Sequence, residues 1–161
     1  MTCKTYYINV LIILLSIVFT ACSDDDKGPV CLETNITMKI NGESQSFEAS
    51  GYGIILTQNG YILDINSGRY SNTPYSEQSF SILLPYKKTG VNVIEQFIYH
   101  QYIDNISFDG DFMNGEFESN VITNNKSCFY ATFSGKLNDG NQEVIITEGK
   151  LSYKYENPFD Q

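Results

Sequence analysis

The stretch Asn35-Ile36-Thr37-Met38-Lys39-Ile40-Asn41-Gly42 decides the fold class of this chain. Every second residue from Ile36 to Ile40 is apolar, and this period of two is typical of a β-strand with one buried face. Asn41-Gly42 then supplies the two residues that adopt positive φ in a tight hairpin. The alternation resumes at Ser46-Phe47-Glu48-Ala49, so the pattern predicts a β-hairpin.

The same alternation continues through most of the chain. Further strands are expected at residues 52–57, 61–66, 80–84, 128–136 and 143–155. Residues 67–78 are rich in hydroxyl side chains and contain Gly68 and Pro74, which predicts a loop. Residues 91–106 fit both a helical and a strand spacing, and their β-branched and aromatic content favours a strand.

This pattern predicts one all-β domain over residues 31–161, with about eight to eleven short strands. We expect an antiparallel β-sandwich, because two facing sheets bury one face of every strand. The alternative is a lipocalin-like β-barrel, which buries one face of each strand equally well.

An apolar run precedes this domain. Residues 6–19 follow the single basic residue Lys4 and are too short to span a bilayer, which takes about 20 apolar residues. They are typical of a cleaved signal peptide. Phe19-Thr20-Ala21-Cys22 resembles the lipobox of bacterial lipoproteins, with Phe19 in place of the usual leucine. The resemblance implies removal of residues 1–21 and a diacylglyceryl group on Cys22.

The residues after Cys22 are polar and acidic: Ser23, Asp24, Asp25 and Asp26. They resemble the export signal of Bacteroidetes lipoproteins, which implies display on the outer face of the outer membrane, held there by the N-terminal lipid. Residues 22–30 are expected to be a flexible acidic tether.

Both ends of the domain carry a second resemblance. The Asn41-Gly42 hairpin and the segments 133–137 and 144–151 are similar to those of small uncharacterised Bacteroidetes lipoproteins of β-sandwich type. That resemblance implies no known activity.

Two cysteines lie within the expected domain, Cys31 and Cys128. An exported protein meets oxidising conditions, so we expect a disulfide between them. Closing so long a loop would stabilise the fold by about 4 to 5 kcal/mol in the chain-entropy model. The alternative is a pair of buried free thiols.

Composition excludes nucleic acid as a partner. The chain has 10 Lys+Arg and 19 Asp+Glu, for a formal net charge of −9. Phosphate binding requires clustered basic residues, and the one adjacent basic pair is Lys87-Lys88. The acidic excess favours solubility and repels other anions.

The sequence predicts neither catalytic residues nor a cofactor. His100 is the only histidine, which excludes a multi-histidine zinc site, and no Gly-x-Ser-x-Gly elbow is present. The carboxylates between Asp104 and Glu118 are expected to be solvated loop residues. A carboxylate-dependent hydrolase and a calcium site around Asp109-Gly110-Asp111 are the alternatives for this segment, although we expect no metal site.

The polar segment 67–78 carries the best candidates for ligand binding: Arg69, Tyr70, Asn72 and Tyr75. Tyrosine rings can stack on sugars, although the same rings can also pack back over the edge of the domain. We therefore expect a non-enzymatic binding domain whose partner is a glycan or an outer-membrane protein. A structural accessory subunit of an outer-membrane complex is the alternative.

Overall fold

The computed structural model of the chain describes residues 31–72 and 75–160, and residues 113–115 by their backbone alone. The predicted signal peptide, the lipid attachment at Cys22, the export signal and the tether lie outside the described residues. Within the described ranges, no helix is long and apolar enough to cross a membrane.

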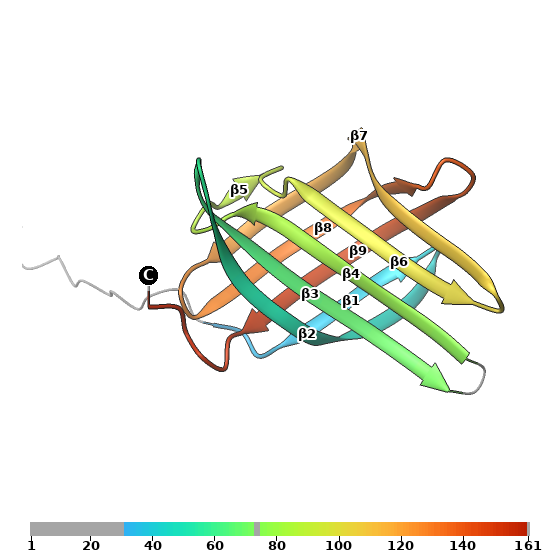
Figure 1. The fold of residues 1–161 in the computed structure, drawn as a ribbon, viewed down its shortest axis with the longest axis horizontal. Coiled ribbons are helices and arrows are strands. Elements are labelled where there is room, and N and C mark those ends of the chain that lie inside the picture. The colour runs from blue at the N-terminus through green and yellow to red at the C-terminus, as the bar shows by residue number, and fades with distance from the viewer. Residues whose placement is uncertain (1–30, 73–74, 161) are drawn as a thin grey trace, which may run out of the picture. The chain divides into compact units, whose positions relative to one another are not determined.

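The described part of the chain consists of nine β-strands joined by turns and loops (Figure 1). They are β1 (Asn35–Ile40), β2 (Glu43–Thr57), β3 (Gly60–Asn72), β4 (Tyr75–Pro85), β5 (Gly90–Val91), β6 (Gln96–Ile103), β7 (Ile106–Asn124), β8 (Cys128–Asn138) and β9 (Glu143–Lys154).

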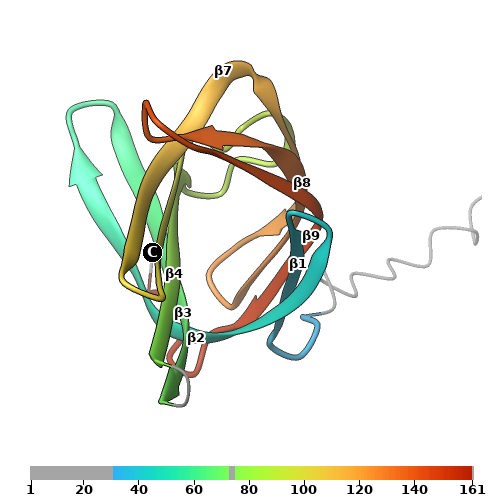
Figure 2. The same ribbon diagram turned by 90° about the vertical axis from the view of Figure 1, so that its right-hand side faces the viewer.

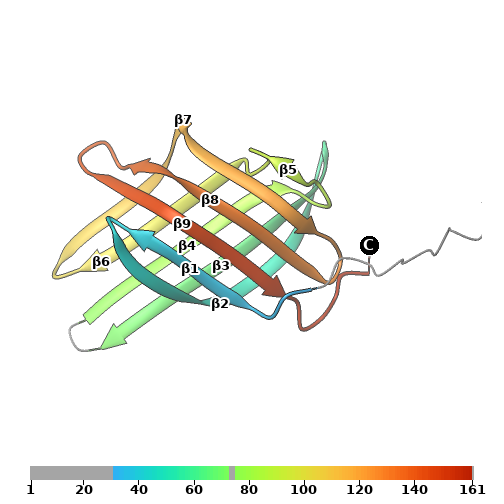
Figure 3. The ribbon, with the colours of Figure 1, turned by 180° about the vertical axis from the view of Figure 1, so that it is seen from behind.

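Eight of these strands close into an antiparallel barrel, so the predicted sandwich is wrong and the barrel alternative fits. Neighbours along the chain pair with one another, while the short β5 adds to the edge of β7. The first and last strands, β1 and β9, pair from Asn35–Ser152 to Ile40–Ile146 and close the ring (Figures 2 and 3). Closure leaves no long unpaired edge, which an open sheet would expose. Period-two alternation is the same in both architectures, so the pattern alone does not distinguish them.

The loop expected at residues 67–78 is also wrong. Residues 67–72 form the end of β3 and residues 75–78 the start of β4, and the two strands pair continuously from Ser67–Phe80 to Asn72–Tyr75. Cross-strand hydrogen bonds hold this polar segment in extended form, overriding its composition. The strand expected within residues 91–106 is confirmed as β6. The loop expected for the carboxylates between Asp104 and Glu118 is wrong, because most of that segment belongs to β7 (Ile106–Asn124).

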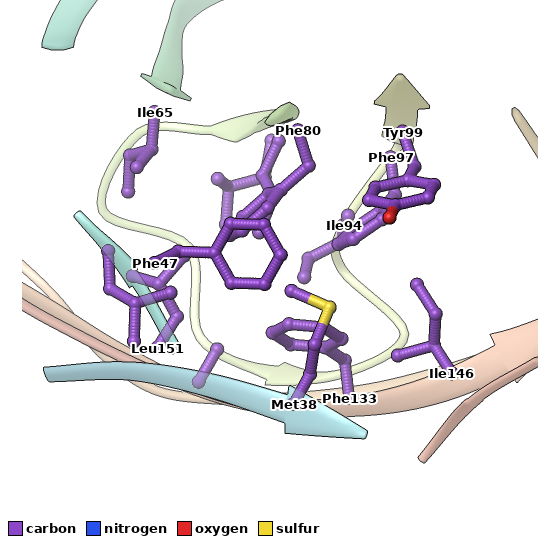
Figure 4. Close-up of a cluster of buried hydrophobic side chains, with 14 of the residues drawn as sticks. Met38, Phe47, Ile65, Phe80, Ile94, Phe97, Tyr99, Phe133, Ile146 and Leu151 are labelled. Atoms are coloured by element: carbon purple, nitrogen blue, oxygen red, sulfur yellow. The ribbon is translucent and has the colours of Figure 1, made fainter. Parts of the chain in front are cut away.

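Aromatic side chains fill the interior of the barrel (Figure 4). Phe80 stacks on Phe97 with ring centroids 5.2 Å apart, and Phe133 lies 5.2 Å from Phe97. Met38 and Ile146 pack against these rings from β1 and β9. The middle of the barrel is therefore a packed core.

Cys31 and Cys128 form a disulfide, which ties the start of the domain to the first residue of β8. We call this the disulfide end of the barrel; it lies at the left of Figure 1 and also carries the β2–β3 turn. The residues after β9 pack here, where Tyr155 stacks on Tyr52 with centroids 4.6 Å apart. The β1–β2, β6–β7 and β8–β9 connections lie at the other end, together with the last residues of β3 and the first of β4, and we call it the tyrosine end.

Candidate ligand-binding face

Three tyrosines from three neighbouring strands meet on the outer wall at the tyrosine end. Tyr70 on β3 and Tyr102 on β6 are the cross-strand partners of Glu77 on β4. The Tyr75 ring lies 5.5 Å from that of Tyr70 and 5.6 Å from that of Tyr102, edge to face in both cases. Tyr70 is 61% exposed and Tyr75 is 45% exposed. We call Tyr70, Tyr75 and Tyr102 the tyrosine face.

Hydrogen bonds hold two of these rings in place. The Tyr75 hydroxyl donates to Glu77 Oε2 at 3.2 Å, and the Tyr102 hydroxyl donates to Asn105 Oδ1 at 3.0 Å. Partial desolvation, followed by the bond to Glu77, raises the pKa of the Tyr75 hydroxyl. The Tyr70 ring is positioned by its edge-to-face contact with Tyr75.

A shallow groove of about 390 Å³ runs beside the tyrosine face. It is lined by residues 48–50 of β2, 68–70 of β3 and 77–79 of β4. Gly68 and Ser79 are cross-strand partners, and because their side chains are small they leave room for the groove above the strands. Glu48, the partner of Gly68 on the other side, and Glu77 bring carboxylates to the groove. A smaller groove of about 190 Å³ shares Ser79 and extends to His100.

His100 and Asp109 form a pair next to this smaller groove. The His100 Nδ1 atom lies 2.6 Å from an Asp109 carboxylate oxygen, and Ser107 donates to the other oxygen at 3.3 Å. Ser79 is the cross-strand partner of His100, yet no hydroxyl in residues 31–72 or 75–160 hydrogen-bonds the imidazole. A serine nucleophile needs that bond to its base, so the pair lacks the geometry of a serine hydrolase.

The structure separates the four residues that the sequence suggested. Tyr70 and Tyr75 lie together on the outer wall, and Asn72 pairs with Tyr75 at the end of the same hairpin. Side chains alternate between the two faces of β3, and Arg69 is on the same face as the buried Ser67 and Ile65. Its side chain therefore faces the barrel interior, opposite to Tyr70. Arg69 contributes to the lining of the groove, but its register places its side chain on the other side of the sheet from the tyrosine rings.

Arg69 belongs instead to a polar cluster inside the tyrosine end. The buried Tyr99 hydroxyl donates to Gln101 Oε1 at 2.9 Å, and Gln78 Nε2 donates to the same oxygen at 3.3 Å. Burial raises the pKa of Tyr99, while the Arg69 guanidinium acts in the opposite direction. Within the part of the chain that the structure describes, the Oε1 atom of Gln78 and the hydroxyl of Ser67 are buried without a hydrogen-bond partner.

The carboxylates of β7 are spread along the strand. Asp104 lies in the β6–β7 turn, and Asp109 pairs with His100. Asp111 accepts a hydrogen bond from the Phe112 backbone N–H at 2.7 Å. Across the described ranges, no three His, Cys, Asp or Glu residues gather to hold a metal ion. The segment proposed as a calcium loop is extended strand, so its backbone does not wrap around a single point.

Two larger grooves lie elsewhere on the barrel wall. One of about 660 Å³ includes Glu33, Glu48 and Tyr155, and one of about 510 Å³ includes Asn92 and Glu148. The aromatic residues that border them, among them Tyr155, are buried. The tyrosine face is therefore distinguished by its exposed rings, although its groove is smaller.

Three residues of the tyrosine face and its groove were not identified from the sequence. Glu48, Glu77 and Tyr102 were assigned no role, because a loop at residues 67–78 gives no register to connect them. If the segment is taken as a hairpin, the period of two places Tyr70, Tyr75 and Glu77 on one side.

Comparisons with protein-family models, with curated proteins and with solved structures found no match to this chain. Its function is therefore argued from the geometry of the site and from the N-terminal sequence.

Proposed function

We propose that this protein is a lipid-anchored lipoprotein of the outer-membrane surface whose barrel binds an extracellular glycan at the tyrosine face. The observation that carries the binding proposal is the contact of the Tyr70, Tyr75 and Tyr102 rings beside the groove at Gly68. No catalytic step is included in this function.

Exposed tyrosines suit a sugar ligand. The apolar face of a pyranose packs on an aromatic ring, and the phenol hydroxyl can bond a sugar hydroxyl at the same time. Tyr70 has the largest exposed fraction of the three tyrosines. The low floor at Gly68 and Ser79 lets a flat sugar ring lie against the strands, and about 390 Å³ is within the usual range for small ligand sites.

The charges near the groove select among glycans. The Glu48 and Glu77 carboxylates can accept hydrogen bonds from sugar hydroxyls. They also repel anions, as does the net charge of −9 on the chain. The ligand class that fits is a neutral or amino-containing glycan, and uronic acids or sulfated sugars are disfavoured.

The anchoring part of the proposal rests on the Phe19-Thr20-Ala21-Cys22 motif and the acidic residues after it. Several acyl chains on one cysteine hold a protein durably in a bilayer, because each buried methylene contributes about 0.8 kcal/mol. Intact mass of the purified protein tests this directly, since an acylated chain starting at Cys22 is expected. Protease treatment of whole cells then tests surface display.

A glycan array tests the binding proposal, comparing wild type with Tyr70→Ala. Loss of the Tyr70 ring is expected to weaken binding about tenfold, which corresponds to about 1.4 kcal/mol. Tyr61→Ala is the matched control, because Tyr61 is also exposed but lies in the hairpin at the disulfide end. Equal loss in both variants would contradict the assignment. An absence of glycan binding, together with a constant cross-linked membrane-protein partner, would favour the structural accessory role.

A further inference from the structure

The disulfide end carries an apolar hairpin tip. Ile55 and Leu56 lie at the end of β2 and are 49% and 69% exposed, while their partner strand adds Tyr61, which is 38% exposed. Leu56 and Tyr61 are direct cross-strand partners next to the turn. Exposed large apolar side chains gathered at a hairpin tip are typical of a docking surface rather than of a solvated turn.

A basic pair lies beside this tip. The loop after β4 carries Lys87 and Lys88, and it is tied to the hairpin by the Tyr86 backbone N–H, which donates to the Tyr61 carbonyl at 2.8 Å. The Lys87 ammonium lies 5.3 Å from the centre of the Tyr86 ring. Apolar side chains flanked by lysines match the boundary between acyl chains and anionic headgroups.

The chain that leaves this end limits how far the tip can be from a membrane. Cys31 is fixed to Cys128 by the disulfide, and nine peptide links separate it from Cys22, which extend to about 30 Å at most. A tether this short gives an effective concentration in the millimolar range, so even a weak apolar contact becomes populated.

We propose that the β2–β3 hairpin tip, with Ile55, Leu56 and Tyr61, docks into the lipid surface to which the chain is anchored. This inference rests on the anchor in the proposed function. Docking orients the barrel with its disulfide end toward the bilayer. Tyr61 and Tyr70 are nine residues apart on β3, which corresponds to about 30 Å along the strand. The tyrosine face then points away from the membrane, toward ligands in the medium.

The chain contains no tryptophan, so one introduced tryptophan reports its own surroundings. The test uses the full chain, processed in its host, with Leu56→Trp as the reporter. It is reconstituted in vesicles of phosphatidylcholine and phosphatidylglycerol that contain brominated phosphatidylcholine. Ile106→Trp is the matched control, because Ile106 is 56% exposed and lies at the tyrosine end. Tyr61→Trp is a second reporter in the hairpin.

Docking predicts that both hairpin reporters shift to shorter emission wavelength and lose most of their emission to the brominated lipid, while Ile106→Trp is unchanged. Protein that sediments with vesicles while both hairpin reporters stay unquenched would overturn the docking alone. Equal quenching at all three positions would also overturn it, because no orientation would then exist. Protein that stays in the supernatant would overturn both the anchor and the docking.

Discussion

Two tyrosines in one aromatic cluster are expected to respond in opposite ways to the same substitution. Tyr155 is 4% exposed, and its hydroxyl is buried with no hydrogen-bond partner among the described residues. The hydroxyl of Tyr52, stacked against it, donates to the Asn157 carbonyl at 3.1 Å and accepts from the Asn157 N–H at 2.9 Å. Replacement by phenylalanine keeps both rings and removes only the hydroxyl.

The magnitudes follow from these contacts. A buried polar group without a partner costs about 1–3 kcal/mol, so Tyr155→Phe is expected to raise the free energy of unfolding by about 1 kcal/mol. Each hydrogen bond contributes about 0.5–1.5 kcal/mol, so Tyr52→Phe is expected to lower it by about 1–2 kcal/mol. For a domain of this size, 1 kcal/mol corresponds to a shift in Tm of about 3–5 °C.

Urea unfolding at neutral pH measures both variants, and a second series at alkaline pH tests the cause. Burial raises the pKa of the Tyr155 hydroxyl, so the wild type should lose stability as pH rises above about 10, where the unfolded tyrosine ionises. Tyr155→Phe should lose less over that range. The reasoning is refuted if Tyr155→Phe destabilises the protein by 1 kcal/mol or more at neutral pH, or if the two variants change in the same direction.

Three further predictions concern the barrel wall, the disulfide and one turn. A Cβ at Gly149 would lie 2.5 Å from the Phe133 ring and 2.6 Å from its carbonyl oxygen, so Gly149→Ala should lower the free energy of unfolding by about 2–3 kcal/mol. A Cβ at Gly53 would have no atom within 4 Å, so Gly53→Ala should leave the free energy of unfolding unchanged or raise it by up to about 1 kcal/mol. Similar losses of stability in the two alanine variants would contradict the close packing at Gly149. Replacing Cys31 and Cys128 by alanine should lower the free energy of unfolding by up to about 4–5 kcal/mol. In the wild-type protein, labelling of both thiols without reductant would exclude the bridge. Backbone N–H groups of Asn141 and Gln142 lower the pKa of the Asp139 carboxyl, so its stabilising effect should be present above about pH 3.9 and lost as pH falls through the lowered pKa. An NMR titration that gives Asp139 an ordinary or raised pKa would contradict this.

Much of the fold could be predicted from the sequence, because strand alternation is local. The Asn41-Gly42 hairpin is present, with both residues at positive φ. Ring closure was not predictable in the same way, since the pairing of β1 with β9 joins residues more than 100 positions apart. The sequence of β1 or of β9 taken alone does not indicate that these two strands pair with each other.

The candidate site was partly predictable for a related reason. Tyr70 and Tyr75 could be selected as exposed aromatic residues, and their rings do contact each other. Arg69 could not be placed, because a single step in register moves a side chain from the outer wall to the interior. Tyr102 and Glu48 come from other strands, so their approach to the site depends on the tertiary pairing.

Binding of a neutral glycan at the tyrosine face is tested most directly by NMR of protein with labelled tyrosine rings, titrated with the best ligand from the array. The ring signals of Tyr70, Tyr75 and Tyr102 are expected to shift together and to saturate, while those of Tyr61 and Tyr153 stay unchanged. Shifts confined to Tyr61 and Tyr153, or no shift at Tyr70 with any neutral or amino-containing glycan, would contradict the proposed site.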